Sequence, residues 1–189
     1  MNRKIGGAAS LLNGLCVLGF AISMLLGTNT GCYLFSMFIA FSFVGMMGGC
    51  ACLCEKEERL AGYLSLAFAG MYAAIILLVY FAQVTTVRFG GLSQQAAALL
   101  DYQQFGLFFS YDLLGYALMA LSTFFAGLTI QVHTKADRWL KRLLLLHGIF
   151  FFSCLILPMF PVFTPEGEAW VGVAVCLSFF KGCPQKGAV

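Results

Sequence analysis

The stretch 60–84, LAGYLSLAFAGMYAAIILLVYFAQV, contains no charged side chain. A bilayer core about 30 Å thick is crossed by roughly 20 residues of α-helix, because each residue adds about 1.5 Å. An uninterrupted apolar run of this length is typical of a helix that faces lipid rather than water. The stretch therefore predicts a transmembrane helix, and the rest of the chain repeats its pattern.

Further long apolar runs lie on both sides of this stretch. They cover 5–26, 32–54, 104–130 and 143–162. A last run, 168–180, is shorter, so its length fits a short span, a tilted span or a re-entrant segment. We predict an all-α fold, a polytopic transmembrane helix bundle with six spans, which forms a single transmembrane domain over residues 1–189.

The composition excludes several other classes of protein. Hydrophobic residues make up 61% and charged residues 10% of the 189 residues, and the mean hydropathy is +0.90. Soluble domains are about 45–50% apolar and about 25% charged. The net charge of +3 is small, and the basic residues lie in short segments between apolar runs, as orientation signals do. We therefore expect the lipid bilayer as a partner and exclude nucleic acid.

The distribution of Lys and Arg predicts how the helices cross the membrane. When the segments between the runs are assigned alternately to two sides, ten of the eleven basic residues fall on one side. These are Arg3, Lys4, Lys56, Arg59, Lys135, Arg138, Lys141, Arg142, Lys181 and Lys186, whereas Arg88 stands alone on the other side. Cytoplasmic loops carry the excess of Lys and Arg. This split requires 168–180 to cross the membrane, and it then predicts that both termini are cytoplasmic.

The longest predicted outer segment, 85–103, contains its own helical pattern. Apolar residues from Leu92 to Leu100 follow helical spacing, and Ser93 is a suitable N-cap. We predict a short helix that lies at the outer membrane interface. The segment is either a connector packed on the bundle or a lid over an outward-facing cavity.

Small residues recur at four-residue spacing on the first two predicted helices. Because lipid gives helices no hydrophobic reason to associate, their contacts depend on the close approach that small side chains permit. The positions that we predict as helix contacts are Gly6, Ser10, Gly14, Gly19, Ser23, Gly27, Gly45 and Gly49. They fit packing within the bundle or docking onto another membrane protein or a second copy of the chain.

Asp112 and His147 are ionisable side chains inside predicted spans, where a charge is costly and therefore suggests a function. The helical rise places Asp112 nearer the outer boundary and His147 nearer the inner one. Tyr116 lies one turn from Asp112 and reaches roughly the depth of His147, as does Asn13 of the first predicted helix, whereas Tyr72 lies near the depth of Asp112. We predict a polar column, formed by Asp112, Tyr72, Tyr116, Asn13 and His147, that binds a small polar ligand or relays protons.

Each member of this predicted column also has a purely structural explanation. Asp112 could be hydrated from the outer side, and His147 could bond a neighbouring carbonyl or extend toward the interface. The tyrosines and Asn13 could serve helix contacts. Both explanations are left open by the sequence.

Three cysteines form a C-x-C-x-C run, in which Cys50 and Cys54 share one helix face. Thiolates bind soft metals, but a tetrahedral site needs further ligands, and no C-x-x-C pair occurs. We predict that these cysteines are small apolar packing residues in a reducing compartment, with metal binding at Cys50 and Cys54 or palmitoylation in a eukaryotic host as alternatives. We predict no cofactor.

A resemblance to known membrane proteins covers about the last half of the chain. The stretch from Tyr111 to Tyr116, YDLLGY, the basic segment Arg138 to Arg142, RWLKR, and Pro158 resemble bacterial multi-pass inner-membrane proteins of unknown function. The resemblance implies a bacterial inner-membrane location. Six helices in a chain of this size also resemble, in architecture alone, the substrate-binding subunits of energy-coupling-factor vitamin transporters.

Three classes of function remain. The first is binding or transport of a small solute through the polar column, and the alternative is a non-catalytic membrane scaffold or regulatory subunit. An intramembrane enzyme ranks last, because no G-x-S-x-G, H-E-x-x-H, P-loop or dinucleotide motif occurs in the sequence.

Overall fold

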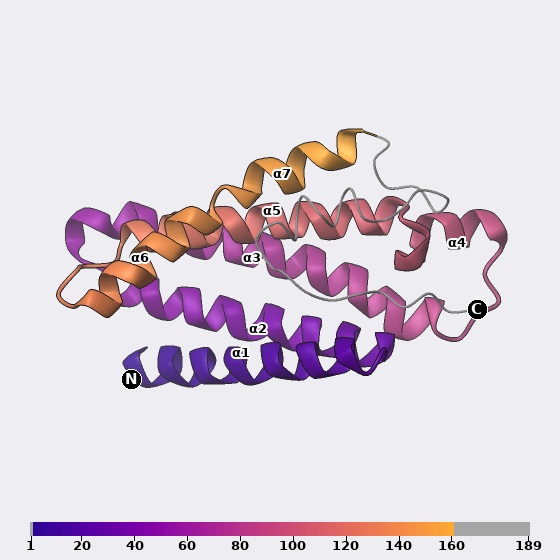
Figure 1. The fold of residues 1–189 in the computed structure, drawn as a ribbon, viewed down its shortest axis with the longest axis horizontal. Helices are drawn as coiled ribbons and strands as arrows, with labels where there is room; N and C mark the ends of the chain where they lie inside the picture. The colour runs from indigo at the N-terminus through magenta and orange to yellow at the C-terminus, as the bar shows by residue number, and fades with distance from the viewer. Residues whose placement is uncertain (1, 161–189) are drawn as a thin grey trace.

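Helices and short turns make up the whole part of the chain that the computed structural model describes, residues 2–160 (Figure 1). The long helices are α1 (Asn2–Leu25), α2 (Asn29–Leu53), α3 (Arg59–Ala82) and α5 (Leu107–Leu128), and they are followed by α6 (Lys135–His147) and α7 (Phe150–Ile156). Within residues 2–160, five helical segments are long and apolar enough to cross a membrane, with α6 and α7 together forming the fifth. The protein is therefore an all-α, multi-pass membrane protein. The predicted sixth span, 168–180, and the predicted cytoplasmic C-terminus lie outside the described residues.

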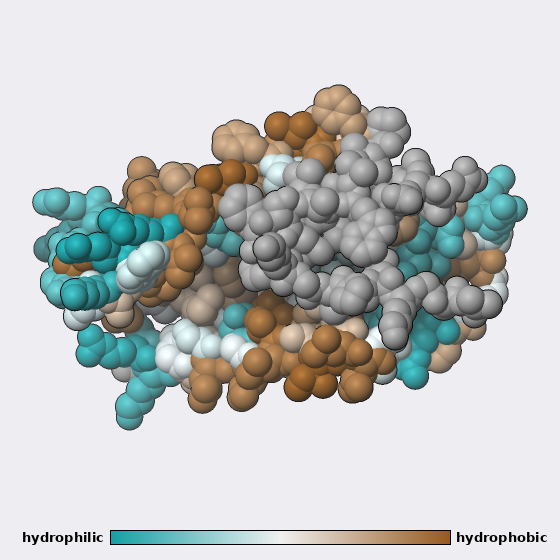
Figure 2. Space-filling view, in the orientation of Figure 1, coloured by the Kyte–Doolittle hydropathy of each residue, from teal (hydrophilic) through white to brown (hydrophobic). Residues whose placement is uncertain are grey.

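Consecutive long helices run antiparallel along one axis, so the sequence alternates between two ends of the bundle (Figure 1). The helix ends and connections at one end of the bundle carry Arg3, Lys4, Lys56, Arg59, Lys135, Arg138, Lys141 and Arg142, whereas Arg88 follows α3 at the opposite end. Lys181 and Lys186 lie outside the described residues. The space-filling view shows hydrophilic residues at both ends and hydrophobic surface between them (Figure 2). This distribution is what a bilayer-spanning bundle requires.

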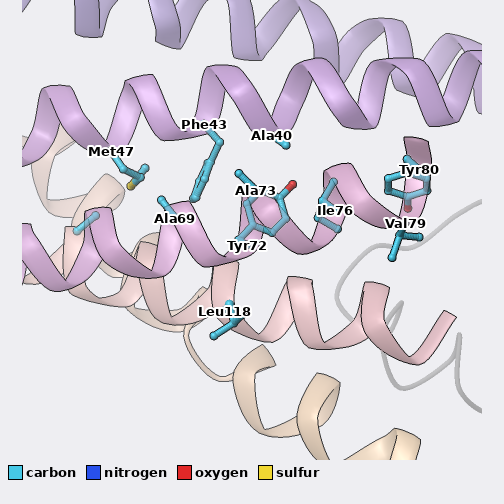
Figure 3. Packing of buried hydrophobic residues seen from close by; sticks show 11 residues of the cluster. Ala40, Phe43, Met47, Ala69, Tyr72, Ala73, Ile76, Val79, Tyr80 and Leu118 are labelled. Atoms are coloured by element: carbon cyan, nitrogen blue, oxygen red, sulfur yellow. The ribbon is translucent and has the colours of Figure 1, made fainter. Parts of the chain in front are cut away.

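The core of the bundle lies where α2, α3 and α5 meet (Figure 3). Phe43 of α2 and Tyr72 of α3 pack edge to face, with ring centroids 5.3 Å apart. In the same core, Ile76 of α3 is fully buried and packs closely on Gly115 of α5. On α5, the Ser122 hydroxyl donates to the carbonyl oxygen of Ser65 on α3 at 2.8 Å. Aromatic packing and small-residue contacts thus join the three central helices.

Helix α1 packs mainly on α2, at positions where small residues allow the backbones to meet. A Cβ built on Gly49 would lie 2.7 Å from the Cα of Gly6, and one on Gly45 would lie 3.0 Å from the Cβ of Ala9. A Cβ on Gly19 would collide with the Phe35 ring. These glycines occupy helix contacts within the bundle.

Three of the predicted ladder positions, Ser10, Gly14 and Gly27, are exposed within residues 2–160, so packing inside the bundle does not account for them. Four residues advance a helix by about 400°, so a four-residue ladder drifts about 40° around the helix per step. Gly6 is therefore buried, whereas Ser10 and Gly14 are exposed and the Ser10 hydroxyl donates to the carbonyl of Gly6 in its own helix. Gly27 has φ +67° and ends α1, because the Thr28 amide donates back to the carbonyl of Ser23.

The predicted outer helix is α4 (Gln94–Leu100), and the Ser93 hydroxyl accepts a hydrogen bond from the amide of Ala96 at 3.3 Å. Ser93 is thus the predicted N-cap. Before α4, the third span ends in a π-helical turn, Gln83–Val87, and after it a 3₁₀ turn, Tyr102–Gln104, leads into α5. Gly106 follows that turn, where a Cβ would collide with the carbonyl oxygen of Ala98.

The fifth span begins earlier than the predicted residue 143. Helix α6 starts at Lys135, because Thr134 and Asp137 form a capping box in which each side chain accepts the other's amide hydrogen. The basic residues predicted in a loop therefore lie in the first turns of a helix. Hydropathy indicates where a helix becomes apolar, but the cap determines where it begins.

The same span is also interrupted, whereas the sequence predicted one continuous helix. Helix α6 ends at His147 and α7 begins at Phe150. Between them, Gly148 is buried against α5, and a Cβ there would lie 2.8 Å from Cδ2 of Phe124. The break thus occurs where Gly148 packs against Phe124 of α5, next to His147.

Candidate functional site

Asp112 is a charged residue type in a buried position, with only 1% of its surface exposed. It lies on α5, one turn inside the start of the helix. Its Oδ2 accepts a hydrogen bond from the Tyr102 hydroxyl at 3.1 Å, whereas Oδ1 is buried and has no hydrogen-bond partner among the described residues. A buried, half-satisfied carboxyl group is costly and therefore needs an explanation.

Tyrosine side chains from four elements surround this carboxyl. The members of this tyrosine cluster are Tyr33 of α2, Tyr72 and Tyr80 of α3, Tyr102 of the 3₁₀ turn and Tyr116 of α5. The Tyr33 ring stacks on Tyr80 with centroids 5.5 Å apart, and the Tyr80 ring lies 5.9 Å from Tyr102. On the other side of Asp112, the Tyr72 and Tyr116 rings lie 6.4 Å apart. The cluster thus extends from the 3₁₀ turn, Tyr102–Gln104, into the middle of the bundle.

Gln83 fixes the position of the 3₁₀ turn, Tyr102–Gln104, over Asp112. Its side chain is buried in the π-helical turn, where Oε1 accepts from the Tyr102 amide at 3.0 Å and Nε2 donates to the Leu100 carbonyl at 2.7 Å. These bonds fix Tyr102 above α5. Burial raises the pKa of the Tyr102 hydroxyl well above its ordinary value, with the neighbouring Asp112 adding to the effect, so this hydroxyl stays protonated and donates a hydrogen bond to Asp112.

The cluster reaches the surface at its outer end. Gln103, next to Tyr102, is exposed, and its Nε2 donates to the Tyr33 hydroxyl at 3.1 Å. Tyr33 in turn lies 6.1 Å, ring centroid to ring centroid, from Tyr102. The ring contact between Tyr102 and Tyr33 therefore leads from the buried carboxyl to the surface of the protein at the α4 end of the bundle.

A cleft of about 670 Å³ opens on the inward side of the cluster. Its polar lining includes Asn13, Tyr72, Tyr116, Thr123 and His147. Most of the remaining wall is apolar and comes from residues of α1, α2, α5, α6 and α7, among them Phe20, Phe43, Met46, Met119, Leu143 and Phe150. The volume is that of a small-molecule site, and such a wall favours a ligand that is largely apolar.

His147 lies at the end of α6, beside the break at Gly148, and its Nδ1 is 2.8 Å from the Thr123 hydroxyl of α5. This contact fixes the ring and leaves Nε2 for a ligand in the cleft. Asn13 is differently placed, since its Nδ2 donates to the Ser42 hydroxyl at 3.0 Å and the Ile39 carbonyl at 3.3 Å on α2. Asn13 therefore joins α1 to α2 at the edge of the cleft.

The structure thus brings four of the five predicted column residues to one cleft, namely Asn13, Tyr72, Tyr116 and His147. Asp112 lies behind the cleft, within the tyrosine cluster. The sequence did not indicate Tyr33, Tyr80, Gln83, Tyr102 or Thr123. Only Tyr80 had a usable signal, since it stands two helical turns after Tyr72 on the same face.

The cysteine run ends α2 with its members in different surroundings. Cys52 is exposed, Cys50 is half-buried, and the Cys54 thiol donates to the Ala51 carbonyl at 3.1 Å. Among residues 2–160, no group of three or more His, Cys, Asp or Glu side chains is placed to hold a metal ion.

Comparison of the chain with protein-family models, with curated proteins and with solved structures found no match.

Proposed function

We propose that the protein binds a small solute in the cleft, within a bacterial inner membrane, and that it serves in the uptake or transport of that solute. The observation that carries this proposal is the convergence of Tyr72, Tyr116 and His147 on one cleft of about 670 Å³. Small-molecule sites combine apolar walls with a few polar groups that orient the ligand. The predicted location follows from the resemblance to bacterial inner-membrane proteins.

The lining defines the class of solute. The hydroxyl of Thr123 and Nδ2 of Asn13 already have protein partners. The hydrogen-bonding groups of the lining that remain for a ligand are Oδ1 of Asn13, Nε2 of His147 and the hydroxyls of Ser36, Tyr72 and Tyr116. The rest of the wall is apolar. A largely apolar molecule with a few hydrogen-bonding groups therefore fits better than the small polar ligand that the sequence predicted.

Native mass spectrometry of the protein, purified in mild detergent, tests the proposal. We expect a small molecule to copurify with the wild type and to be lost from Tyr116→Phe and His147→Gln, since each change removes one hydrogen-bonding group at nearly constant volume. Tyr111→Phe is the matched control, because Tyr111 is an exposed tyrosine on the same helix. A molecule that is retained equally in all variants would contradict the proposal.

The alternative, a membrane scaffold or regulatory subunit, is favoured by the exposed side of α1. Leu11, Leu15 and Leu18 are exposed there, and a Cβ added to Gly7 or Gly14 would meet nothing within 4 Å. A partner helix could pack closely on this face. Copurification of a protein in fixed stoichiometry, without a small molecule, would support this second function.

A further inference from the structure

Among residues 2–160, Asp112 has no positively charged partner. The titratable side chains that face it are all tyrosines, Tyr33 from α2, Tyr72 and Tyr80 from α3, Tyr102 from the outer turn and Tyr116 from α5, while Cys154 of α7 lies beyond Tyr116. Within residues 2–160, no Lys, Arg or His interacts with this carboxyl. An ionised Asp112 would therefore be an uncompensated charge inside a helix bundle.

The two carboxyl oxygens differ in a way that indicates how the charge is removed. Oδ2 has a donor in Tyr102, but Oδ1 is buried without a hydrogen-bond partner among the described residues. A proton on Oδ1 makes the group neutral and turns this oxygen from a bare acceptor into a donor. The Tyr80 hydroxyl beside the carboxyl can accept that hydrogen.

We propose that Asp112 is a proton-binding site that exchanges its proton with the outer side of the membrane through the tyrosine cluster. In the resting protein the carboxyl holds the proton on Oδ1. To exchange, the carboxyl releases this proton through the tyrosine hydroxyls to the outer side, where Tyr33 and Gln103 reach the surface. It takes up a new proton when Tyr102 passes its hydroxyl proton to Oδ2 and in the same event receives one from the outer side, so that Tyr102 stays neutral. No group is oxidised or reduced, and one proton moves per event.

The proton-binding site is separate from the cleft, but a solute bound in the cleft can affect it. Tyr116 lies one helical turn after Asp112 and lines the cleft, and it also interacts with Tyr80. A solute that bonds the Tyr116 hydroxyl would therefore alter the hydrogen-bonding partners around Asp112. Proton binding itself needs no solute, so it can be tested whether or not the cleft binds one.

The test uses the full chain in lipid bilayers, labelled with ¹³C at the aspartate side-chain carboxyl. The chain has three aspartates, and Asp101 and Asp137 serve as internal references because both cap exposed turns. By solid-state NMR or infrared spectroscopy at pH 7, we expect one carboxylic-acid signal and two carboxylate signals. Asp112→Asn should remove only the acid signal, whereas Asp101→Asn should remove only a carboxylate signal.

Three carboxylate signals in the wild type would overturn the proposal. A carboxylate at Asp112 whose signal shifts on addition of Na⁺ would also overturn it, because a metal cation and not a proton would then neutralise the group. Both results are independent of the cleft, so failure of solute binding and failure of proton binding are distinguishable.

The proposed route through Tyr102 has its own measurement. In D₂O the acid signal shifts as the proton is replaced by deuterium, and the rate of this shift reports access to the outer water. We expect Tyr102→Phe to slow the exchange about tenfold or more, because it removes the hydroxyl that passes the proton while keeping the ring. Tyr111→Phe should leave the rate unchanged. An unchanged rate in Tyr102→Phe would overturn the route.

Discussion

The hydroxyl of Thr123 donates to the carbonyl of Ala120 at 2.9 Å and lies 2.8 Å from Nδ1 of His147. A hydroxyl has one hydrogen, so Thr123 can only accept from the histidine while it keeps its own helix bond. Nδ1 of the neutral His147 ring therefore carries the hydrogen. Nε2 is then the acceptor that faces a ligand.

This arrangement predicts the tautomer of His147, which ¹⁵N NMR of histidine-labelled protein can measure. We expect the Nδ1–H form in the wild type and a mixture of tautomers in Thr123→Val, which keeps the side-chain shape but removes the hydroxyl. His133 is the internal reference, because it is exposed and remote from Thr123. A wild-type His147 in the Nε2–H form would contradict this assignment.

A second prediction concerns the contact between Gly6 and Gly49. A methyl group at Gly49 would lie 2.7 Å from backbone atoms of α1, so the helices must separate to admit it. We expect Gly49→Ala to destabilise the bundle by about 1–3 kcal/mol, as overpacking does. Thermal unfolding in detergent measures this loss.

Gly14→Ala is the matched control for that substitution. A Cβ at Gly14 meets no atom within 4 Å, and alanine favours a helix over glycine by about 1 kcal/mol or less. We expect equal or slightly higher stability. A similar loss in both variants would show that α1 does not contact α2 through Gly6.

A third prediction concerns Gln83, which bonds the Tyr102 amide and the Leu100 carbonyl. Gln83→Ala would leave these backbone groups without partners, at a cost of about 1–3 kcal/mol for each that stays buried. We expect faster hydrogen exchange of the Tyr102 amide, measured by mass spectrometry. Gln95→Ala should have no such effect, because Gln95 is exposed on α4. If hydrogen exchange of the Tyr102 amide is unchanged in Gln83→Ala, Gln83 does not hold this turn in place.

A fourth prediction concerns orientation in the membrane. The turns rich in Lys and Arg are expected to be cytoplasmic, and α4 is expected to be outside. In a variant whose native cysteines are replaced, Lys135→Cys should react with a membrane-impermeant thiol reagent only in inside-out vesicles. Gln95→Cys should react only in right-side-out vesicles. The reverse pattern would invert the topology.

The long helices could be predicted from the sequence because each is a charge-free or nearly charge-free run of sufficient length. Ser93 marked the start of α4 because a helix N-cap is a local signal. The break at Gly148 could not be predicted, since it depends on Phe124, which is distant in the sequence. In the same way, only the fold of the outer turn reveals that Tyr102 contacts Asp112.

For the candidate site, too, the sequence predicted what depends on local geometry and missed what depends on packing between helices. Helical rise predicted that Tyr72 lies near the depth of Asp112 and Tyr116 near that of His147, and depth follows from local geometry. Which face each helix turns toward its neighbours depends on packing, so the sequence did not indicate that Asn13 would join α1 to α2 or that Asp112 would lie behind the cleft.

The buried Asp112 also bears on how the chain enters the membrane during synthesis. An aspartate at the centre of a helix adds roughly 2.5–3.5 kcal/mol to the cost of inserting that helix alone, and Asp112, one turn inside the start of α5, adds part of this cost. The tyrosines that surround it come largely from earlier parts of the chain, including Tyr80 of α3, which is made before α5. Helix α5 therefore gains by leaving the translocation channel together with α3, as a hairpin, rather than as a separate segment.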